Sequence, residues 1–537
     1  MGESKNDHFA TMSKWIVALR YPLLLLLAAA VYMAGYAVHE ALPGNNPVYP
    51  RGWWGWYDQG EYLKAANAMR HFDWNSALHN YPPIYPLLGV PFVDLLPMHA
   101  FLPIDLLCFL LFIYFFVDFA GKYISWTGAV CALVLAFYVR EVGDWSPNIA
   151  LLNLWVEPWT TTPVATIISY LIWSFDRTFS NQKYPGLGKL AIWGCVGGIV
   201  AATRPLEAVV LLPFYLTVLW SLALRGGCAG QNVTLRSRIG SSAVLIIPGI
   251  FWVLLFLLFN YFVHGSFEGR YFAANAQGNG FHFSDMVEKY ISIFIGAGDL
   301  YGVSGEAIYR RMLWMALSVP ALIYVALKGN RVFRLAAFMM FLQFILYLPY
   351  SDLLPNGIWT YHNIHYFKWL FPYAALFIFW MIRSGIQKEM SERKRDWAFV
   401  FSVIISLPIL FLRIELVADR DVHAMTSDQQ GVPQVELTAD RPVEMELVTL
   451  PALSGDYPKV YFGGENQVFA DGKPLKFIRD YRFFMRGSGG VQLLFIRPVV
   501  ARSVSIRAKE LSPRPTDEPI GVYRTRLALG WPVWARR

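Results

Sequence analysis

Charged residues are scarce in this chain. Asp, Glu, Lys and Arg make up 16% of its 537 residues, hydrophobic residues make up 55%, and the mean hydropathy is +0.37. Soluble domains carry about 25% charged residues, so this composition excludes an ordinary soluble enzyme. It predicts an α-helical polytopic membrane protein.

Cysteine is also rare, with four residues in all. Three lie in apolar segments and Cys228 lies in a basic loop, so no pair is placed for an extracellular disulfide. Zinc-ligand spacings and a phosphate-cradling glycine loop are missing as well. We therefore expect no metal and no cofactor, with a lone divalent ion near Asp58 and Glu61 as the alternative.

Apolar runs that are long enough, or nearly long enough, to cross a bilayer predict about eleven transmembrane helices. They lie at residues 21–38, 100–119, 124–139, 158–174, 189–203, 206–222, 241–262, 312–327, 333–350, 367–383 and 398–416. The run at 84–96 predicts a further half-span or an interfacial helix. No small-residue cleavage site follows the first run, which indicates a retained signal anchor. Residues 1–416 are thus expected to form the membrane domain.

Lys and Arg accumulate in the even-numbered connections between these runs, which the positive-inside rule assigns to the cytoplasm together with the N-terminus. The orientation of the chain in the membrane therefore accounts for the net charge of +8, and we expect no nucleic-acid partner. The odd-numbered connections are rich in aromatic residues and acids and are predicted to be external. They are residues 39–99, 140–157, 263–311 and 351–366. Short cytoplasmic loops favour a bacterial inner (plasma) membrane, with membrane lipid as a partner.

The last part of the chain, residues 417–537, changes to a polar, strand-like pattern. Val443, Met445 and Leu447 alternate with Glu444 and Glu446, which is the period of a half-buried strand. A glycine-rich loop at 487–490 separates two β-rich runs, as in a hairpin. We expect a soluble all-β, sandwich-like domain on the periplasmic side.

The first external loop, 39–99, places two carboxylates among aromatic rings beside the membrane. Asp58 precedes an amphipathic stretch, 59–70, and is either the N-cap of that helix or a catalytic base. Trp54 and Trp56 either stack on a sugar ring or belong to the aromatic belt found at bilayer interfaces. An acid beside such rings at a lipid surface indicates chemistry on a lipid-linked carbohydrate.

The segment Asp58-Gln59-Gly60-Glu61-Tyr62 resembles the Asp-Glu-x-x-Tyr motif of polytopic glycosyltransferases of the GT-C fold. The nearest types are the lipid A aminoarabinose transferases and the protein O-mannosyltransferases. Three later segments resemble the family in the same order: Tyr81-Pro82-Pro83-Ile84-Tyr85-Pro86, Ala202-Thr203-Arg204-Pro205-Leu206-Glu207 and His365-Tyr366-Phe367-Lys368-Trp369-Leu370-Phe371-Pro372. The resemblance covers roughly residues 10–416.

Two positions depart from the aminoarabinose transferases. Glu61 stands where they have Arg, and Tyr81 stands where they have Lys before Pro-Pro. Both family positions contact the donor phosphate. The resemblance therefore implies that other cations bind the phosphate in this chain.

The resemblance implies transfer of a sugar, with inversion, from a polyprenyl (undecaprenyl or decaprenyl) phosphate donor. The acceptor would be a cell-envelope glycan, a lipid or a protein at the periplasmic face. Asp58 would be the general base, and Glu61 or Glu157 would hold the acceptor or tune Asp58. Glu157 is alternatively a first-turn acid that the helix dipole stabilises.

Cations at the outer ends of spans are the expected phosphate ligands. They are Lys368 and His365, followed by Arg204. Arg204 is alternatively an interfacial anchor or the partner of Glu207. The rings expected to bind sugar or acceptor are Trp54, Trp56, Tyr62 and Tyr81.

Two other functions remain open at this point. A transporter or flippase of lipid-linked sugars is the main alternative, although transporters bury polar groups at mid-bilayer and have repeated halves. The ionisable residues of this chain gather in external loops instead, and no repeat is visible. A membrane O-acyltransferase using His362 or His365 is the second alternative.

Overall fold

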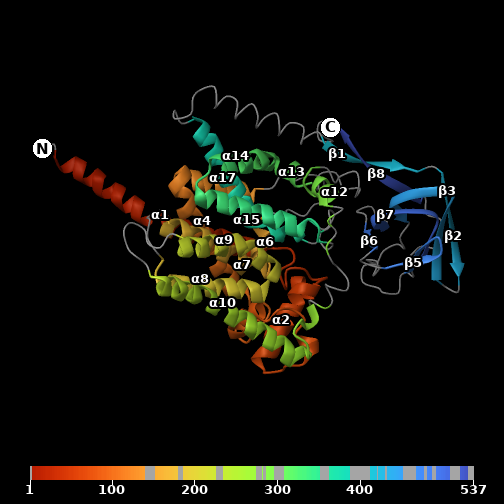
Figure 1. The fold of residues 1–537 in the computed structure, drawn as a ribbon, viewed down its shortest axis with the longest axis horizontal. Helices are drawn as coiled ribbons and strands as arrows, with labels where there is room; N and C mark the ends of the chain where they lie inside the picture. Colours follow the sequence, from red (N-terminus) through yellow and green to blue (C-terminus); the bar gives the residue numbers. More distant parts are fainter. Residues whose placement is uncertain are drawn as a thin grey trace.

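The computed structural model describes most of the chain. The described residues are 3–138, 151–179, 185–224, 234–271, 273, 281, 283, 286–295, 307–350, 353, 358, 362–386, 412–419, 421–429, 432–450, 467–476, 480–485, 491–507 and 520–529. They form a helical region followed by a β domain (Figure 1).

The helical region contains the following α-helices: α1 (Glu3–Val38), α2 (Tyr57–Arg70), α3 (Ile84–Gly89), α4 (Leu102–Ile124), α5 (Trp126–Phe137), α6 (Asn153–Val156), α7 (Thr161–Phe179), α8 (Leu187–Thr203), α9 (Pro205–Leu224), α10 (Leu235–His264), α12 (Met286–Tyr290), α13 (Ile308–Arg311), α14 (Ser318–Lys328), α15 (Arg331–Tyr347) and α17 (Leu370–Ile386). Polar caps start several of them. Thr234 caps α10, and Asn330 accepts the backbone N–H of Phe333 at 2.8 Å to cap α15.

Among the described residues, four helical segments are long and apolar enough to cross a membrane by length and composition. They are Leu19–Val38, Leu102–Ile124, Pro205–Ala223 and Leu235–His264. Six further predicted spans coincide with helices that do not meet both criteria, so the prediction of about eleven transmembrane helices is confirmed only as a multi-pass helical fold. The run at 84–96 forms only α3 and a short 3-10 turn, and Pro91, which has no N–H to continue the helix, lies just after the end of α3.

The last predicted span, 398–416, needs a correction at its end. Residues 398–411 lie outside the described part of the chain, and strand β1 (Leu412–Ala418) begins inside the predicted span. β-Structure therefore starts five residues before the predicted boundary at 417. Leu412, Ile414 and Leu416 alternate with charged residues, which is a strand pattern hidden by the adjoining apolar run.

The β domain is antiparallel throughout its described strands. They are β1, β2 (Val422–Gln429), β3 (Val432–Leu450), β4 (Gln467–Ala470), β5 (Lys473–Leu475), β6 (Tyr481–Met485), β7 (Val491–Arg507) and β8 (Gly521–Leu529). The main order is β1-β8-β3-β7-β4-β5, while β2 pairs with β3 and β6 pairs with β7. The β6–β7 pairing confirms the predicted hairpin, and Val443, Met445 and Leu447 are buried as their alternation predicted.

The two longest strands of this domain, β3 and β7, pair along most of their length. The pairing of β3 with β7 shifts register between Thr438 and Val443 and again between Met445 and Leu447. Such irregularities bend strands and let one strand serve two parts of a folded sheet. The hydrophobic core of the β domain is separate from the core of the helical region.

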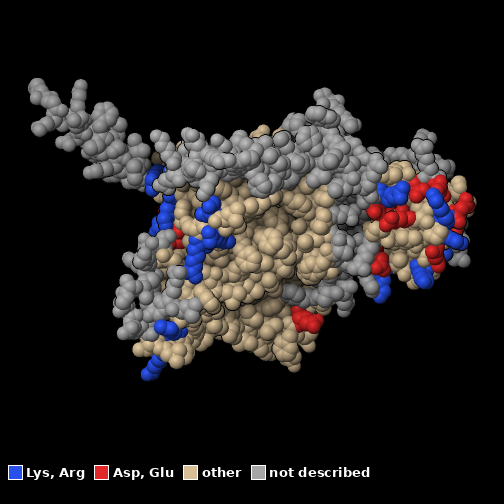
Figure 2. All heavy atoms as spheres, turned by 45° about the horizontal axis from the view of Figure 1, so that its top comes forward, with Lys and Arg blue, Asp and Glu red and all other residues tan. Residues whose placement is uncertain are grey.

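The helical region has a basic end, defined by Lys and Arg at helix termini. They are Lys122, Arg177, Arg238, Arg331 and Arg383. In Figure 2 the visible Lys and Arg of the helical region lie on the side away from the β domain, with uncharged surface between, while the β domain carries both basic and acidic residues. The β domain lies at the opposite end, beside α12 and α13 (Figure 1).

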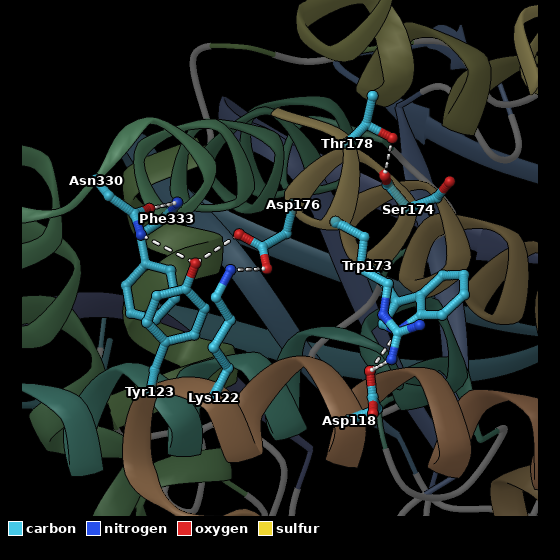
Figure 3. Close-up of polar contacts among 10 residues, drawn as sticks. Asp118, Lys122, Tyr123, Trp173, Ser174, Asp176, Thr178, Asn330 and Phe333 are labelled. Carbon is cyan, nitrogen blue, oxygen red and sulfur yellow. Dashed lines mark hydrogen bonds and ion pairs between the residues drawn. The ribbon is translucent and has the colours of Figure 1, made fainter. Parts of the chain in front are cut away.

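Two aspartates organise the basic end (Figure 3). Asp176 of α7 accepts a bond from Lys122 Nζ at 2.9 Å and from Tyr123 Oη at 2.6 Å, both on α4. Asp118 of α4 accepts Trp173 Nε1 and Arg177 Nη2, each at 2.7 Å. These bonds hold α4 against α7 and so fix the position of the opposite ends of the same helices.

Candidate active site

Helix α2 carries Asp58 in its first turn. The helix follows Trp56, the N-cap residue, whose side chain makes no capping bond. Asp58 is therefore not the N-cap, and the capping alternative is wrong because the helix starts two residues earlier than the stretch 59–70 expected from the sequence. Gly60 lets α2 pack tightly, since a Cβ there would lie 2.7 Å from the carbonyl oxygen of Trp54.

The Asp58 carboxylate faces a cluster of tyrosines. The Tyr81 hydroxyl donates a short hydrogen bond to Asp58 Oδ1. The Tyr81 ring lies 4.9 Å from that of Tyr62 and 4.8 Å from that of Tyr271. Burial and the nearby Asp58 raise the pKa of Tyr81, so this phenol remains a donor and Asp58 the acceptor. Helix α2, the segment before α3 and the long connection after α10 thus meet around Tyr81.

The cluster extends from Tyr62 to a buried arginine. Tyr62 hydrogen bonds with the Thr160 side chain, and Arg204 Nη1 donates to Thr160 Oγ1 at 2.8 Å. Asp58 and Arg204 both act electrostatically on Tyr62, and Arg204 also interacts with Tyr271. One set of tyrosines therefore lies between a carboxylate and a fixed guanidinium.

Arg204 precedes α9 and is held on three sides. Its Nε donates to Glu207 Oε1 at 2.5 Å and its Nη2 donates to Tyr347 Oη at 2.8 Å, while its side chain is 14% exposed. This confirms the alternative in which Arg204 pairs with Glu207. A guanidinium has five N–H groups, and the bonds to Glu207, Thr160 and Tyr347 use three of them. Among the residues that the structure describes, no partner takes up the second N–H of either terminal nitrogen.

Glu157 is fully buried between two histidines. Its Oε2 accepts from His362 Nδ1 at 2.8 Å and from Trp159 Nε1 at 3.1 Å, and its Oε1 lies within ion-pair distance, 3.1 Å, of His39 Nε2. Burial alone would raise the pKa of Glu157, but the two histidines lower it to about 2. The pKa of His362 is raised, because the pairing with Glu157 outweighs burial. Glu157 thus anchors three chain segments and has little freedom to touch a substrate.

His365 and Lys368 lie in the interior of the helical region. His365 Nδ1 hydrogen bonds with Thr161 Oγ1 at 2.9 Å, and its ring stacks on Trp159 at 3.9 Å. Burial, together with Arg204 and Lys368, places the pKa of His365 well below its usual value, so its imidazole is neutral. Lys368 Nζ donates to Leu154 O at 2.7 Å and to Thr162 Oγ1 at 2.8 Å, and the residue is 2% exposed. Neither side chain presents a charge at an open surface.

The other predicted residues occupy different environments. Glu61 pairs with Lys64 along α2 at 2.5 Å. Trp54 is buried and donates through Nε1 to the carbonyl of Met98, whereas Trp56 is 39% exposed and meets the His362 ring edge-on at 5.5 Å. Of the two tryptophans, Trp56 is thus the one accessible to a sugar.

Several residues of the site were missed in the sequence. They are His39, Thr160, Tyr271 and Tyr347. Each comes from a different connection or helix end, and polar residues at span ends in external connections were the one signal that could have identified them. Their proximity depends on how the helices pack.

Helix ends explain where the site lies. Arg204 precedes α9, Thr160 precedes α7, Tyr347 ends α15 and Lys368 precedes α17. The opposite ends of α7, α15 and α17 carry the cations of the basic end. The site and the basic end therefore lie at opposite ends of the helical region. Among the described residues, no group of three or more His, Cys, Asp or Glu side chains is arranged to hold a metal ion.

Comparison with known proteins gives a limited result. No family model and no curated protein matches the chain. Two similar solved structures are crystal structures of ArnT from Cupriavidus metallidurans. The apo structure has 15% identity and a TM-score of 0.41 over 72% of this chain, and this chain spans 63% of that protein. The structure bound to undecaprenyl phosphate has 13% identity and a TM-score of 0.42, covering 73% of this chain and 70% of that one. At these values the similarity assigns neither an activity nor a ligand to this chain.

Proposed function

We propose that this protein is a membrane glycosyltransferase that moves a sugar from a polyprenyl phosphate donor to an acceptor hydroxyl at the end of the helical region opposite its basic end. The observation that carries the proposal is the placement of Asp58 and Arg204 around one group of tyrosines. Such a transfer needs a base for the acceptor and a cation for the departing phosphate.

Asp58 is the general base in this proposal. Its carboxylate accepts the proton of the acceptor hydroxyl while that oxygen attacks the anomeric carbon. The bond between the anomeric carbon and the phosphate oxygen breaks, and polyprenyl phosphate leaves with the electron pair. Attack from the side opposite the phosphate inverts the anomeric centre. Tyr81 holds the carboxylate in one orientation.

Arg204 is the cation that we assign to the leaving phosphate. Its position is fixed by Glu207, Thr160 and Tyr347, so little side-chain entropy is lost when a phosphate binds. Its two remaining N–H groups are suited to two phosphate oxygens. His365 and Lys368, which the sequence placed at the phosphate, support the wall of the site in this proposal. Trp56 offers an exposed ring for the sugar.

The positive-inside rule supports an external site, since the Lys- and Arg-rich helix ends lie on the other side. We propose a bacterial inner membrane with the site and the β domain on the periplasmic face. The acceptor is a cell-envelope glycan, lipid or protein.

The test is release of free polyprenyl phosphate from a labelled polyprenyl phosphate sugar by the purified protein. Asp58→Asn should lower the rate by about 10² to 10⁴, the range that general base catalysis contributes. Glu61→Gln is the matched control, because it neutralises the acid three residues later on the same helix, and it should retain most of the rate.

Undiminished turnover in a folded Asp58→Asn protein would refute the assignment of the base. Movement of the labelled lipid across liposomes that survives this substitution, without release of sugar, would instead indicate a transporter.

A further inference from the structure

A groove of about 520 Å³ lies between α9 and α15, near the basic end. Its walls include Leu216 and Trp220 of α9 and Phe338 of α15, and two arginines, Arg331 and Arg334, border it. Leu216 lies twelve residues beyond Arg204, about 18 Å along a helix, so the groove is separate from the candidate active site.

The apolar wall of the groove is open to the surroundings of the helices. Leu216 is 62% exposed, Trp220 is 65% exposed and Phe338 is 50% exposed. Helix α9 is long and apolar enough to span a membrane, so side chains exposed on it face lipid rather than water. Acyl chains are the natural occupants of such a wall.

The polar part of the groove is positive. Arg331 and Arg334 lie one turn apart at the start of α15, and the lining residues include no carboxylate. Arg331 Nη2 donates to Ser221 Oγ at 2.6 Å and to Thr217 O at 3.3 Å, which fixes this guanidinium against α9. Arg334 is exposed, and its one side-chain hydrogen bond among the described residues is a long one, 3.3 Å, to Leu327 O.

The helix dipole adds to this charge. The N-terminus of a helix carries a partial positive charge, which disfavours arginine in the first turn and favours an anion nearby. Helix α15 has no acid in its first turn. An anion bound beside Arg331 and Arg334 would offset both the side-chain charges and the dipole.

We propose that this groove binds one anionic phospholipid from the leaflet at the basic end. Its phosphate lies between Arg331 and Arg334, and an acyl chain lies along Leu216, Trp220 and Phe338. A zwitterionic lipid fits the apolar wall equally well but leaves the positive charge unmatched.

The full-length protein, purified in detergent, can be titrated with phosphatidylglycerol and with phosphatidylcholine of the same chains, with bound lipid counted by native mass spectrometry. Phosphatidylglycerol should bind more tightly. Arg334→Gln should weaken its binding about fivefold, which corresponds to about 1 kcal/mol for one basic residue at an anionic headgroup. Arg236→Gln is the matched control, because Arg236 is exposed in the first turn of α10 at the same end, and it should leave binding unchanged.

A second variant tests the wall. Leu216→Asp should weaken both lipids, and thermal unfolding verifies that each variant is folded. Equal affinity for the two lipids, or equal losses for Arg334→Gln and Arg236→Gln, would overturn the proposal. Soluble glycerol 3-phosphate that binds as tightly as phosphatidylglycerol would show a free-phosphate site and would also overturn it.

Discussion

Tyr81 donates a hydrogen bond to Asp58 and helps to orient its carboxylate. Tyr81 and Asp58 lie in the same connection, whereas most other hydrogen-bonded pairs of the site join residues that lie far apart in the sequence. Asp58 could be predicted because its motif is local. The pairing of Glu157 with His39 and His362 could not, because nothing in the local pattern shows which helix ends meet.

We predict that Tyr81→Phe lowers kcat about tenfold while KM changes little. A hydrogen bond to a charged group is worth roughly 1.5–3 kcal/mol, and its loss lets the carboxylate rotate away from the acceptor. Steady-state kinetics with a labelled donor measure the effect. Tyr85→Phe is the control, since the Tyr85 hydroxyl bonds with Asp105 instead. An equal loss in both variants would contradict the role of Tyr81.

A second prediction at this scale concerns Glu157 and pH. The lowered pKa of Glu157 stabilises the fold above the usual glutamate pKa of 4.5, and this contribution is lost as pH falls toward about 2. The raised pKa of His362 stabilises the fold below the usual histidine pKa of 6.5, and this contribution is lost as pH rises through the raised pKa. The pair is therefore strongest between about pH 4.5 and 6.5.

Glu157→Gln should accordingly reduce the Tm most within that window. Removing one partner of a buried pair costs about 3–5 kcal/mol. Thermal unfolding of both proteins across pH 3 to 9 provides the measurement. A Tm difference that does not depend on pH would contradict the pairing.

At the scale of elements, apolar runs were sufficient to locate the helices because lipid requires long, continuous hydrophobic segments. They were insufficient where a strand followed directly, as β1 shows, because a short apolar strand is indistinguishable from the end of a helix. The β6–β7 hairpin was predictable because glycines mark its turn locally. The packing of α2 against its preceding turn was not, since it depends on a single backbone approach at Gly60.

We predict that Gly60→Ala is destabilising and reduces activity. The new Cβ would lie 2.7 Å from the Trp54 carbonyl oxygen, so α2 must shift, at a cost of about 1–3 kcal/mol. Gly55→Ala is the matched control, because its Cβ would meet nothing closer than Arg51 Cβ at 3.9 Å. Thermal unfolding and turnover of the two variants should differ clearly. Equal behaviour would show that α2 tolerates displacement.

For the whole molecule, the separation of charge predicts orientation. The basic end and the β domain lie at opposite ends of the helical region (Figures 1 and 2). Composition and loop charge anticipated this arrangement. The separate core of the β domain was expected only from the change in residue pattern near 417.

Labelling of single cysteines in a background without the four native ones measures the orientation. We expect a membrane-impermeant maleimide to label His423→Cys, exposed on β2, in intact spheroplasts. Arg236→Cys, at the basic end, should react only after permeabilisation. The reverse pattern would place the candidate site in the cytoplasm and contradict the proposed function.

Helix α1 contributes to this site through the residue that follows it. Tyr32 and Tyr36 are buried, and His39 contacts Glu157. If a peptidase cut the chain after Val38, His39 would lose its connection to α1. The buried Glu157 carboxylate would then depend on His362 alone among its two histidine partners. The burial of Tyr32 and Tyr36 and the pairing of His39 make α1 part of the packed helical region, and we expect removal of α1 to lower activity.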